Sequence, residues 1–201
     1  MWKRVSCFIV IALVGSVLLS GCSFIDGKTA TSNWKPSQEV IVINGHTLPP
    51  EPNPAINNST LLGVDSNDNG VRDDVEIWIY KKYKDKHPIH IDIAMQAGRA
   101  WQKVLEDPTK AKSIYQIVDA PGYCEGYYKL YANKYGDALL VKQEITSKNF
   151  RREIVFNTKD RLEAYWQYDT LLSGNSYTIP WSNELKAYCD FNTSKYESTN
   201  D

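Results

Sequence analysis

Residues 93–105 read IAMQAGRAWQKVL, and this stretch decides the fold class. Its apolar residues recur every three or four positions, which places them on one face of an α-helix and not on alternate faces of a strand. The stripe consists of Ile93, Ala97, Ala100, Trp101, Val104 and Leu105. A helix with an apolar face of this width buries it against neighbouring elements. The stretch therefore predicts a core helix of a mainly α domain.

Similar spacing on both sides of this stretch predicts further helices. Asp107 before Pro108 has the form of a helix cap followed by a first turn. Residues 139–141 are also assigned to a helix, whereas Ile154–Phe156 fits either a helix or a strand. The other helical faces are Val75, Trp78, Ile79 and Tyr83; Ala111, Ile114, Tyr115 and Val118; Cys124, Tyr127, Tyr128, Leu130, Tyr131 and Tyr135, ended by Gly136; and Leu162, Tyr165, Trp166 and Leu172, ended by Gly174. Residues 77–190 are thus predicted to form a compact helical domain.

The segment before these helices has a different character. The β-branched run Val40–Ile43 ends at Asn44-Gly45, which predicts a short strand and a turn. Four prolines follow within six positions, and each disfavours helix for the residue before it. Residues 39–64 are therefore predicted to be a short strand and an extended, proline-rich arm. At the other end, residues 191–201 are predicted to be a frayed polar tail.

Residues 65–76 read DSNDNGVRDDVE and match the EF-hand calcium loop at each diagnostic position. Calcium prefers several oxygen ligands, which alternate residues of a tight loop can supply. Gly70 permits the sharp turn at position six. Glu76 at position twelve would chelate the ion with both oxygens from the first turn of the following helix. The predicted ligands are Asp65, Asn67, Asn69, the carbonyl of Val71, Asp73 and Glu76.

The loop resembles the single calcium loops of dockerin-type and other extracellular repeats, and the resemblance covers twelve residues. The proline-rich segment before Asp65 is not an amphipathic helix, so a paired helix-loop-helix sensor is not expected. With three charged ligands, we expect a weak, structural Ca²⁺ site with a dissociation constant of roughly 10⁻⁴ M. The alternative is a metal-free turn that caps the helix, because Asp, Asn and Gly favour turns on their own.

The N-terminus carries an export signal. Lys3 and Arg4 precede an apolar run that ends at Leu19, the arrangement of a secretory signal peptide. The sequence Leu19-Ser20-Gly21-Cys22 resembles the lipobox of bacterial lipoproteins. The resemblance implies cleavage after residue 21, acylation of Cys22 and attachment to a membrane, with Ser23 implying the outer rather than the inner membrane. The alternative is an ordinary signal peptide in which Cys22 is incidental. Residues 22–38 would form the tether.

The remaining cysteines suggest one disulfide bond. Cys7 leaves with the signal and Cys22 carries lipid, so Cys124 and Cys189 remain in an exported, oxidising environment. We predict that these two residues are bonded, although two buried free thiols also fit the sequence.

The overall charge argues against a nucleic-acid-binding protein. The 201 residues contain 23 basic and 24 acidic side chains. Removing the 21 signal residues, with Lys3 and Arg4, leaves 180 residues with 21 basic and 24 acidic side chains, a formal charge of −3. Such a chain is not a typical nucleic-acid binder.

His87, His90 and Asp92 suggest a transition-metal site, but Pro88 favours a connector with a capping histidine instead.

The sequence contains no G-x-S-x-G, H-E-x-x-H or P-loop pattern, and no catalytic residue is predicted. The chain resembles small Gram-negative lipoproteins of uncharacterised function that carry this calcium loop. We therefore expect a non-enzymatic, lipid-anchored envelope protein that binds an envelope protein or a cell-wall polymer. The alternative is an envelope hydrolase, or a glycan- or peptide-binding module that uses the clustered tyrosines.

Overall fold

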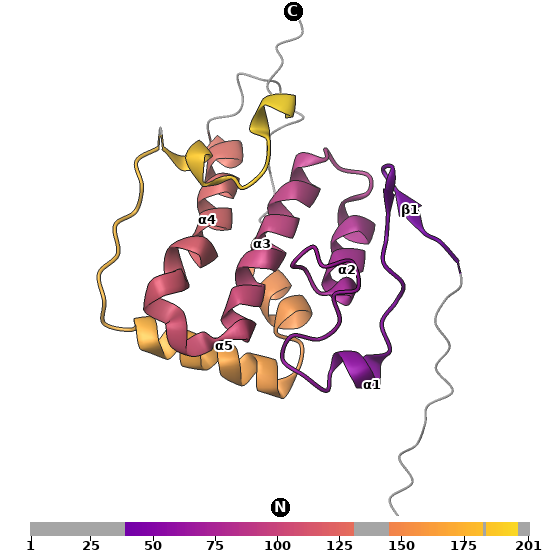
Figure 1. The fold of residues 1–201 in the computed structure, drawn as a ribbon. Coiled ribbons are helices and arrows are strands. Elements are labelled where there is room, and N and C mark those ends of the chain that lie inside the picture. The colour runs from indigo at the N-terminus through magenta and orange to yellow at the C-terminus, as the bar shows by residue number, and fades with distance from the viewer. Residues whose placement is uncertain (1–38, 131–144, 183, 197–201) are drawn as a thin grey trace, which may run out of the picture. The chain divides into compact units, whose positions relative to one another are not determined.

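The apolar stripe of residues 93–105 lies in helix α3 (Ile89–Glu106), in a computed structural model that describes residues 39–130, 145–182 and 184–196 (Figure 1). Helix α3 contacts α2 (Asp73–Tyr83), α4 (Ala111–Leu130) and α5 (Lys159–Leu172). All six residues of the stripe are buried. The fold is mainly α, as the hydrophobic periodicity predicts.

Helix α4 is longer than the sequence pattern predicts. The sequence predicts one helix around Ala111–Val118 and another around Cys124, but the structure has a single helix that continues through Pro121. A proline inside a helix removes one backbone hydrogen bond and is unfavourable by itself. Here Ala111, Val118, Cys124 and Tyr128 are all buried, so tertiary packing holds both halves in one element. Its closest partners are α3 and η5 (Leu185–Tyr188).

The predicted strand and turn form a small hairpin. Strand β1 (Val42–Ile43) pairs antiparallel with β2 (His46–Thr47). The turn residues Asn44 and Gly45 have φ values of 53° and 78°, which Asn and Gly tolerate well. The hairpin brings His46 back towards α2.

The proline-rich arm is not extended throughout, so this prediction was wrong in part. Pro54–Asn57 form a short helix, α1, in which Pro54 occupies the first turn. The side chain of Asn53 accepts hydrogen bonds from the backbone of Ala55 and Ile56. Proline is favourable at this position because its missing N–H would have no partner in the first turn.

The ambiguous segment around Ile154 is helical. Phe150–Val155 form a π-helical turn, η4, and not a strand. Arg72, which precedes α2, donates to the carbonyls of Ile154 and Val155 at 2.9 and 3.0 Å. These carbonyls would otherwise lack partners at the end of the turn, so the contact explains why Arg72, in the segment of residues 65–76, packs against η4.

Two cap predictions are confirmed, and the prediction of a frayed tail was wrong for part of its length. Asp107 accepts from the backbone of Thr109 at the start of the 3₁₀ turn η1 (Pro108–Lys110), and Gly174 follows α5 with φ of 78°. The polar tail contains a further turn, η6 (Thr193–Tyr196), which packs on the core. The hydroxyl of Tyr196 donates to Asp92 at 2.7 Å.

The described helices include none that combines the length and apolar character needed to cross a bilayer. The predicted signal peptide, Cys22 and the tether lie outside the described residues, as do the predicted helix at 139–141 and Tyr131 and Tyr135.

Candidate functional site

Residues 65–76 form a tight loop that leads directly into helix α2. Asp68 and Gly70 have φ values of 53° and 81°, so the chain adopts the left-handed conformation at two positions of the loop. Helix α2 begins at Asp73, which places Glu76 in its first turn. This is the arrangement that the spacing of the sequence predicts for the last ligand of a calcium loop.

Three of the predicted ligands meet at one point. The amide nitrogens of Asn67 and Asn69 lie 3.1 and 2.6 Å from Oε2 of Glu76. Glu76 is fully buried despite its charge. A buried carboxylate requires partners that compensate for lost hydration, and Asn67 and Asn69 of the loop supply those of Oε2.

Asp65 and Asp73 shape the loop by accepting hydrogen bonds from its backbone. Asp65 accepts hydrogen bonds from the backbone of Asn69 and Gly70, at 3.2 and 2.9 Å. Asp73 accepts one from the backbone of Ser66 at 2.9 Å through Oδ1. Its other oxygen, Oδ2, is buried and has no hydrogen-bond partner among the described residues. An orphaned carboxylate oxygen is rare in folded proteins and marks a place where an additional ligand or ion fits.

The electrostatics of the loop favour a bound cation. Burial raises the pKa of Asp73, and the negative charges of Asp65 and Glu76 raise it further, while hydrogen bonds from Ser66 act in the opposite direction. The negative charges of Asp65 and Glu76 therefore make ionisation of Asp73 less favourable. A cation placed among them would reverse this effect.

His46 is the residue at this site that sequence reasoning missed. Its Nε2 lies 2.6 Å from Oε1 of Glu76, and its ring stacks on Tyr80 with centroids 4.4 Å apart. His46 directly follows the predicted turn at Asn44-Gly45. The Asn44-Gly45 turn was the available signal, because a hairpin returns the chain to the surface that its first strand leaves.

The residue types present fit a hard cation, because amide and backbone carbonyl oxygens stand beside the carboxylates. The Oδ1 atoms of Asn67 and Asn69 accept from the backbone of Asn69 and Val71, so both amides would turn their oxygens towards a bound ion. Among the described residues, no three His, Cys, Asp or Glu side chains form a group of the kind that holds a metal by itself. An EF-hand loop does not require one, because carbonyl oxygens of Asn and of the backbone complete its coordination. The side chain of Val71 is buried, which anchors the residue whose carbonyl is the predicted fourth ligand.

The arm is also attached to α5 by a buried arginine. Arg161 donates to the carbonyls of Leu61 and Thr60 at 2.9 and 3.2 Å, and to Asn57 and Asn58. Burial lowers the pKa of Arg161 to about 10, and the nearby Arg72 charge acts in the same direction. The guanidinium therefore remains charged at neutral pH. His46 and Arg161 thus both hold the polypeptide that leads into residues 65–76 on the helical domain, and Gln102 of α3 adds a hydrogen bond to the carbonyl of Leu62.

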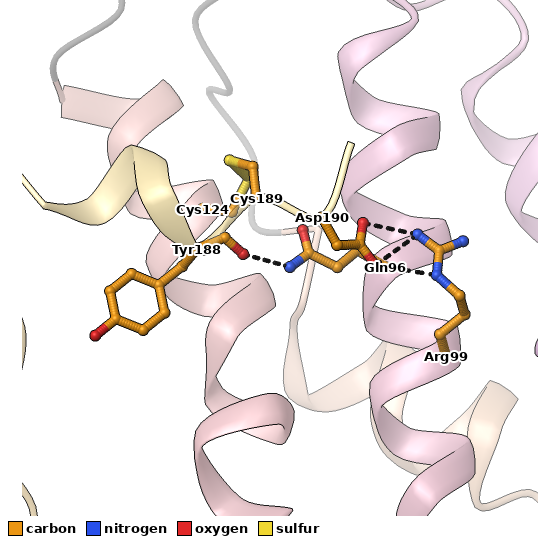
Figure 2. The surroundings of a disulfide bond; sticks show 6 residues. All are labelled: Gln96, Arg99, Cys124, Tyr188, Cys189 and Asp190. Carbon is orange, nitrogen blue, oxygen red and sulfur yellow. Dashed lines mark hydrogen bonds and ion pairs between the residues drawn. A yellow bond between two sulfur atoms is a disulfide. The ribbon is translucent and has the colours of Figure 1, made fainter. Parts of the chain in front are cut away.

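A disulfide bond joins Cys124 of α4 to Cys189, as the cysteine count predicts. Figure 2 shows how the chain around Cys189 is held against α3 as well. The side chain of Gln96 donates to the carbonyl of Tyr188 at 2.6 Å, and Arg99 forms a bidentate pair with Asp190. A cavity of about 480 Å³ lies between α3, α4 and this segment.

The remaining candidates from the sequence are separated or buried. His90 is buried, with Nδ1 3.0 Å from the carbonyl of His87, and burial lowers its pKa and that of His87. Asp92 forms an ion pair with Lys195 and accepts a hydrogen bond from the hydroxyl of Tyr196. Tyr127 and Tyr128 are buried, so this part of the tyrosine-rich helix does not face solvent.

Comparisons with family models, with curated proteins and with solved structures found no match to this chain.

Proposed function

We propose that this chain is a lipid-anchored cell-envelope protein whose loop at residues 65–76 holds one structural Ca²⁺ ion. In this proposal it is not an enzyme. It presents a folded helical domain to an envelope protein or a cell-wall polymer, and calcium fixes the arm and α2 in the conformation that the partner contacts. Attachment to the membrane, with the outer membrane as the proposed location, rests on the lipobox that ends at Cys22.

The observation that carries the calcium part is the convergence of Asn67, Asn69 and Glu76, with Oδ2 of Asp73 buried and unpartnered beside them. The ion would be held by Asp65, Asn67, Asn69, Val71, Asp73 and Glu76. Its chemistry is that of a structural cation, which neutralises carboxylates and fixes the loop. Helix α2 carries both Glu76 and the buried residues Val75 and Ile79, so calcium binding and packing of this helix would be coupled.

Thermal unfolding of the full chain in a non-ionic detergent tests this part. At a calcium concentration tenfold above the dissociation constant, binding adds about 1.4 kcal/mol of stability. For a domain of this size that raises Tm by about 3–6 °C relative to chelator. An equal Tm in calcium and in chelator would contradict a structural role for the ion.

Fractionation and mass spectrometry test the lipid anchor. The chain produced in a Gram-negative host should be recovered with membranes, cleaved before Cys22 and carrying the mass of acyl chains on that residue. The Cys22→Ala variant should be recovered in the soluble fraction. Recovery of an unmodified wild-type chain in the soluble fraction would contradict the anchor.

A binding module for glycans or peptides is the second candidate, and the cavity of about 480 Å³ between α3 and α4 is the observation that favours it. Its lining combines apolar residues such as Ile117 with the polar side chains of Gln96 and Arg99. Protection of the Asp190 segment from proteolysis by a cell-wall fragment would support this candidate, and unchanged cleavage would oppose it.

A further inference from the structure

One carboxylate on α4 lies among tyrosines. Asp119 is one helical turn after Tyr115 and one turn before Tyr123, so the three side chains share a face of the helix. All three are at least partly exposed. This face differs from the one that carries the buried residues Val118, Cys124 and Tyr128.

Two further tyrosines from the chain after α5 contact this face. The rings of Tyr115 and Tyr177 have centroids 4.6 Å apart, and those of Tyr123 and Tyr188 are 5.0 Å apart. Each of these distant residues adds one ring to a tyrosine of α4, so a pair of rings lies on each side of Asp119. We call Asp119, Tyr115, Tyr123, Tyr177 and Tyr188 the tyrosine cluster.

The disulfide bond positions one side of the tyrosine cluster. Tyr188 directly precedes Cys189, which is bonded to Cys124 of α4, and the carbonyl of Tyr188 accepts from Gln96. Figure 2 shows the ring of Tyr188 pointing away from Gln96 and Arg99. Backbone and covalent contacts thus fix this residue, while its ring remains free to pack against Tyr123.

Asp119 has no hydrogen bond or ion pair with any residue that the structure describes. Its side chain is exposed, but neighbouring protein atoms remove part of its hydration, and this raises its pKa. No described cation acts in the opposite direction. Burial, followed by the charge of Asp119, raises the pKa of Tyr168, whose hydroxyl is buried without a hydrogen-bond partner among the described residues. An unpaired carboxylate thus lies near an unpaired donor.

We propose that the tyrosine cluster binds an organic cation, a ligand that carries an alkylammonium group. The electron-rich faces of tyrosine rings attract such cations. The carboxylate of Asp119, which lies between the two tyrosine pairs and has no partner among the described residues, adds direct charge compensation. A neutral sugar could stack on the rings but would leave the charge of Asp119 uncompensated. A hard metal ion would require several oxygen ligands, whereas the cluster offers a single carboxylate.

This site is separate from the calcium loop and from the lipid anchor. The ligands of the loop come from residues 65–76, whereas the cluster comes from α4 and from the chain after α5. Binding of an organic cation at the tyrosine cluster therefore does not depend on the proposed calcium site.

Titration of the full chain in a maltoside detergent, with isotope-labelled tyrosine rings observed by NMR, tests the proposal. The probes are choline, N-acetyl-lysine amide, glucose and 3,3-dimethylbutan-1-ol, the neutral isostere of choline. Choline should shift tyrosine signals with a dissociation constant on the order of millimolar, and the isostere should bind at least about tenfold more weakly. Binding of the lysine derivative and not choline would assign the same site to primary ammonium groups.

Substitutions distinguish the contribution of the Asp119 carboxylate to binding from that of the tyrosine rings. Asp119→Asn should weaken cation binding about tenfold. Tyr123→Phe should bind as the wild type does, because the ring remains, whereas Tyr123→Leu should weaken binding. Asp160→Asn, which removes an exposed carboxylate on α5, is the matched control and should have no effect.

Three results would overturn the proposal: no shift of tyrosine signals by either cation, equal binding of choline and its isostere or glucose, or unchanged binding in Asp119→Asn. Circular dichroism of each variant establishes that it is folded. If a variant fails to fold, the comparison of choline with its neutral isostere on the wild type still tests whether binding requires the positive charge.

Discussion

The Nε2 atom of His46 lies 2.6 Å from Oε1 of Glu76, the carboxylate that the sequence assigns to bidentate calcium chelation. One oxygen of this carboxylate therefore faces the hairpin, and the other faces Asn67 and Asn69. The contact joins the arm to the candidate ion site through one buried residue. It also means that an ion chelated by both oxygens of Glu76 would compete with the imidazole.

Glu76→Gln should abolish the calcium-dependent increase in Tm, because an amide cannot supply two anionic oxygens to the ion. The measurement is thermal unfolding in calcium and in chelator. Asp68→Asn is the matched control, since it removes a charge from the same loop at a non-ligand position. The φ of 53° at Asp68 suits Asn well, so this control should fold normally and keep the calcium response. A calcium response retained by Glu76→Gln would exclude this residue as a ligand.

His46→Ala should destabilise the chain in chelator by about 1–3 kcal/mol, because the buried carboxylate of Glu76 loses a hydrogen-bond partner. In calcium the loss should be smaller, because the ion can occupy the freed oxygen. Urea denaturation in both conditions measures the difference. Thr47→Ala, in the same strand, controls for disturbance of the hairpin. Equal destabilisation with and without calcium would show that His46 and the ion site are not coupled.

Gly63→Ala should be among the most destabilising single substitutions, with a cost above about 3 kcal/mol. Gly63 has φ of 69°, and an added Cβ would lie 2.6 Å from Oδ1 of Asn57 and 2.8 Å from Nη2 of Arg161. Gly174 also has a positive φ, but nothing lies within 4 Å of the added atom. Gly174→Ala should therefore cost only the backbone strain, about 1–2 kcal/mol. Chemical denaturation of both variants compares them, and equal losses would contradict the crowding at Gly63.

Removal of the disulfide should lower stability by about 4 kcal/mol in the chain-entropy description. The bond closes a loop with a sequence separation of 65 residues. Cys124→Ala combined with Cys189→Ala is the suitable variant, because Cys124 is fully buried and Ala introduces no polar group there. Denaturation of the wild type with reductant should give a similar loss. A loss below about 1 kcal/mol by both routes would assign the positioning of residues 185–190 to Gln96 and Arg99 instead.

Acidification should destabilise the chain through His90. Burial is the main cause that lowers the pKa of His90 below 6.5, with Lys86 acting in the same direction, while the bond to the His87 carbonyl and the Glu125 charge oppose it. The unfolded chain therefore takes up a proton at a pH where the folded chain does not. The contribution of His90 to the free energy of unfolding is therefore fully present above pH 6.5, the pKa of the unfolded chain. It decreases as the pH falls below that value.

Denaturation between neutral pH and about pH 5 measures this dependence, a range above the ordinary carboxylate pKa values. His90→Asn keeps a side-chain donor for the His87 carbonyl but removes the titrating ring, so its stability should depend less on pH. The pKa of His87 is also lowered by burial, and the remaining slope in the variant should reflect that residue. An unchanged slope would show that His90 does not contribute.

The sequence predicted those features that depend on local order. The spacing of Ile93, Ala97 and Trp101 identified a buried helix, Asn44-Gly45 identified a turn, and the loop residues appeared in ligand order. Features that depend on competition between local preferences were predicted less well. Pro121 favours a helix break, but burial on both sides of it keeps α4 continuous. Ile154–Phe156 has strand-like composition, but capping by Arg72 accompanies a helical turn.

By itself, the sequence determined the helical fold class and the order of residues in the candidate calcium loop, because periodicity and turn chemistry are properties of the chain. The cysteine count identified Cys124 and Cys189 as the candidate pair, and the tertiary structure shows that they are bonded. Only the tertiary structure decided that His46 lies on Glu76, that Arg161 holds the arm, and that Tyr177 and Tyr188 join Tyr115 and Tyr123 around Asp119. These contacts join residues far apart in sequence. Helix packing and the disulfide bring them together, and no local pattern encodes which distant surfaces will meet.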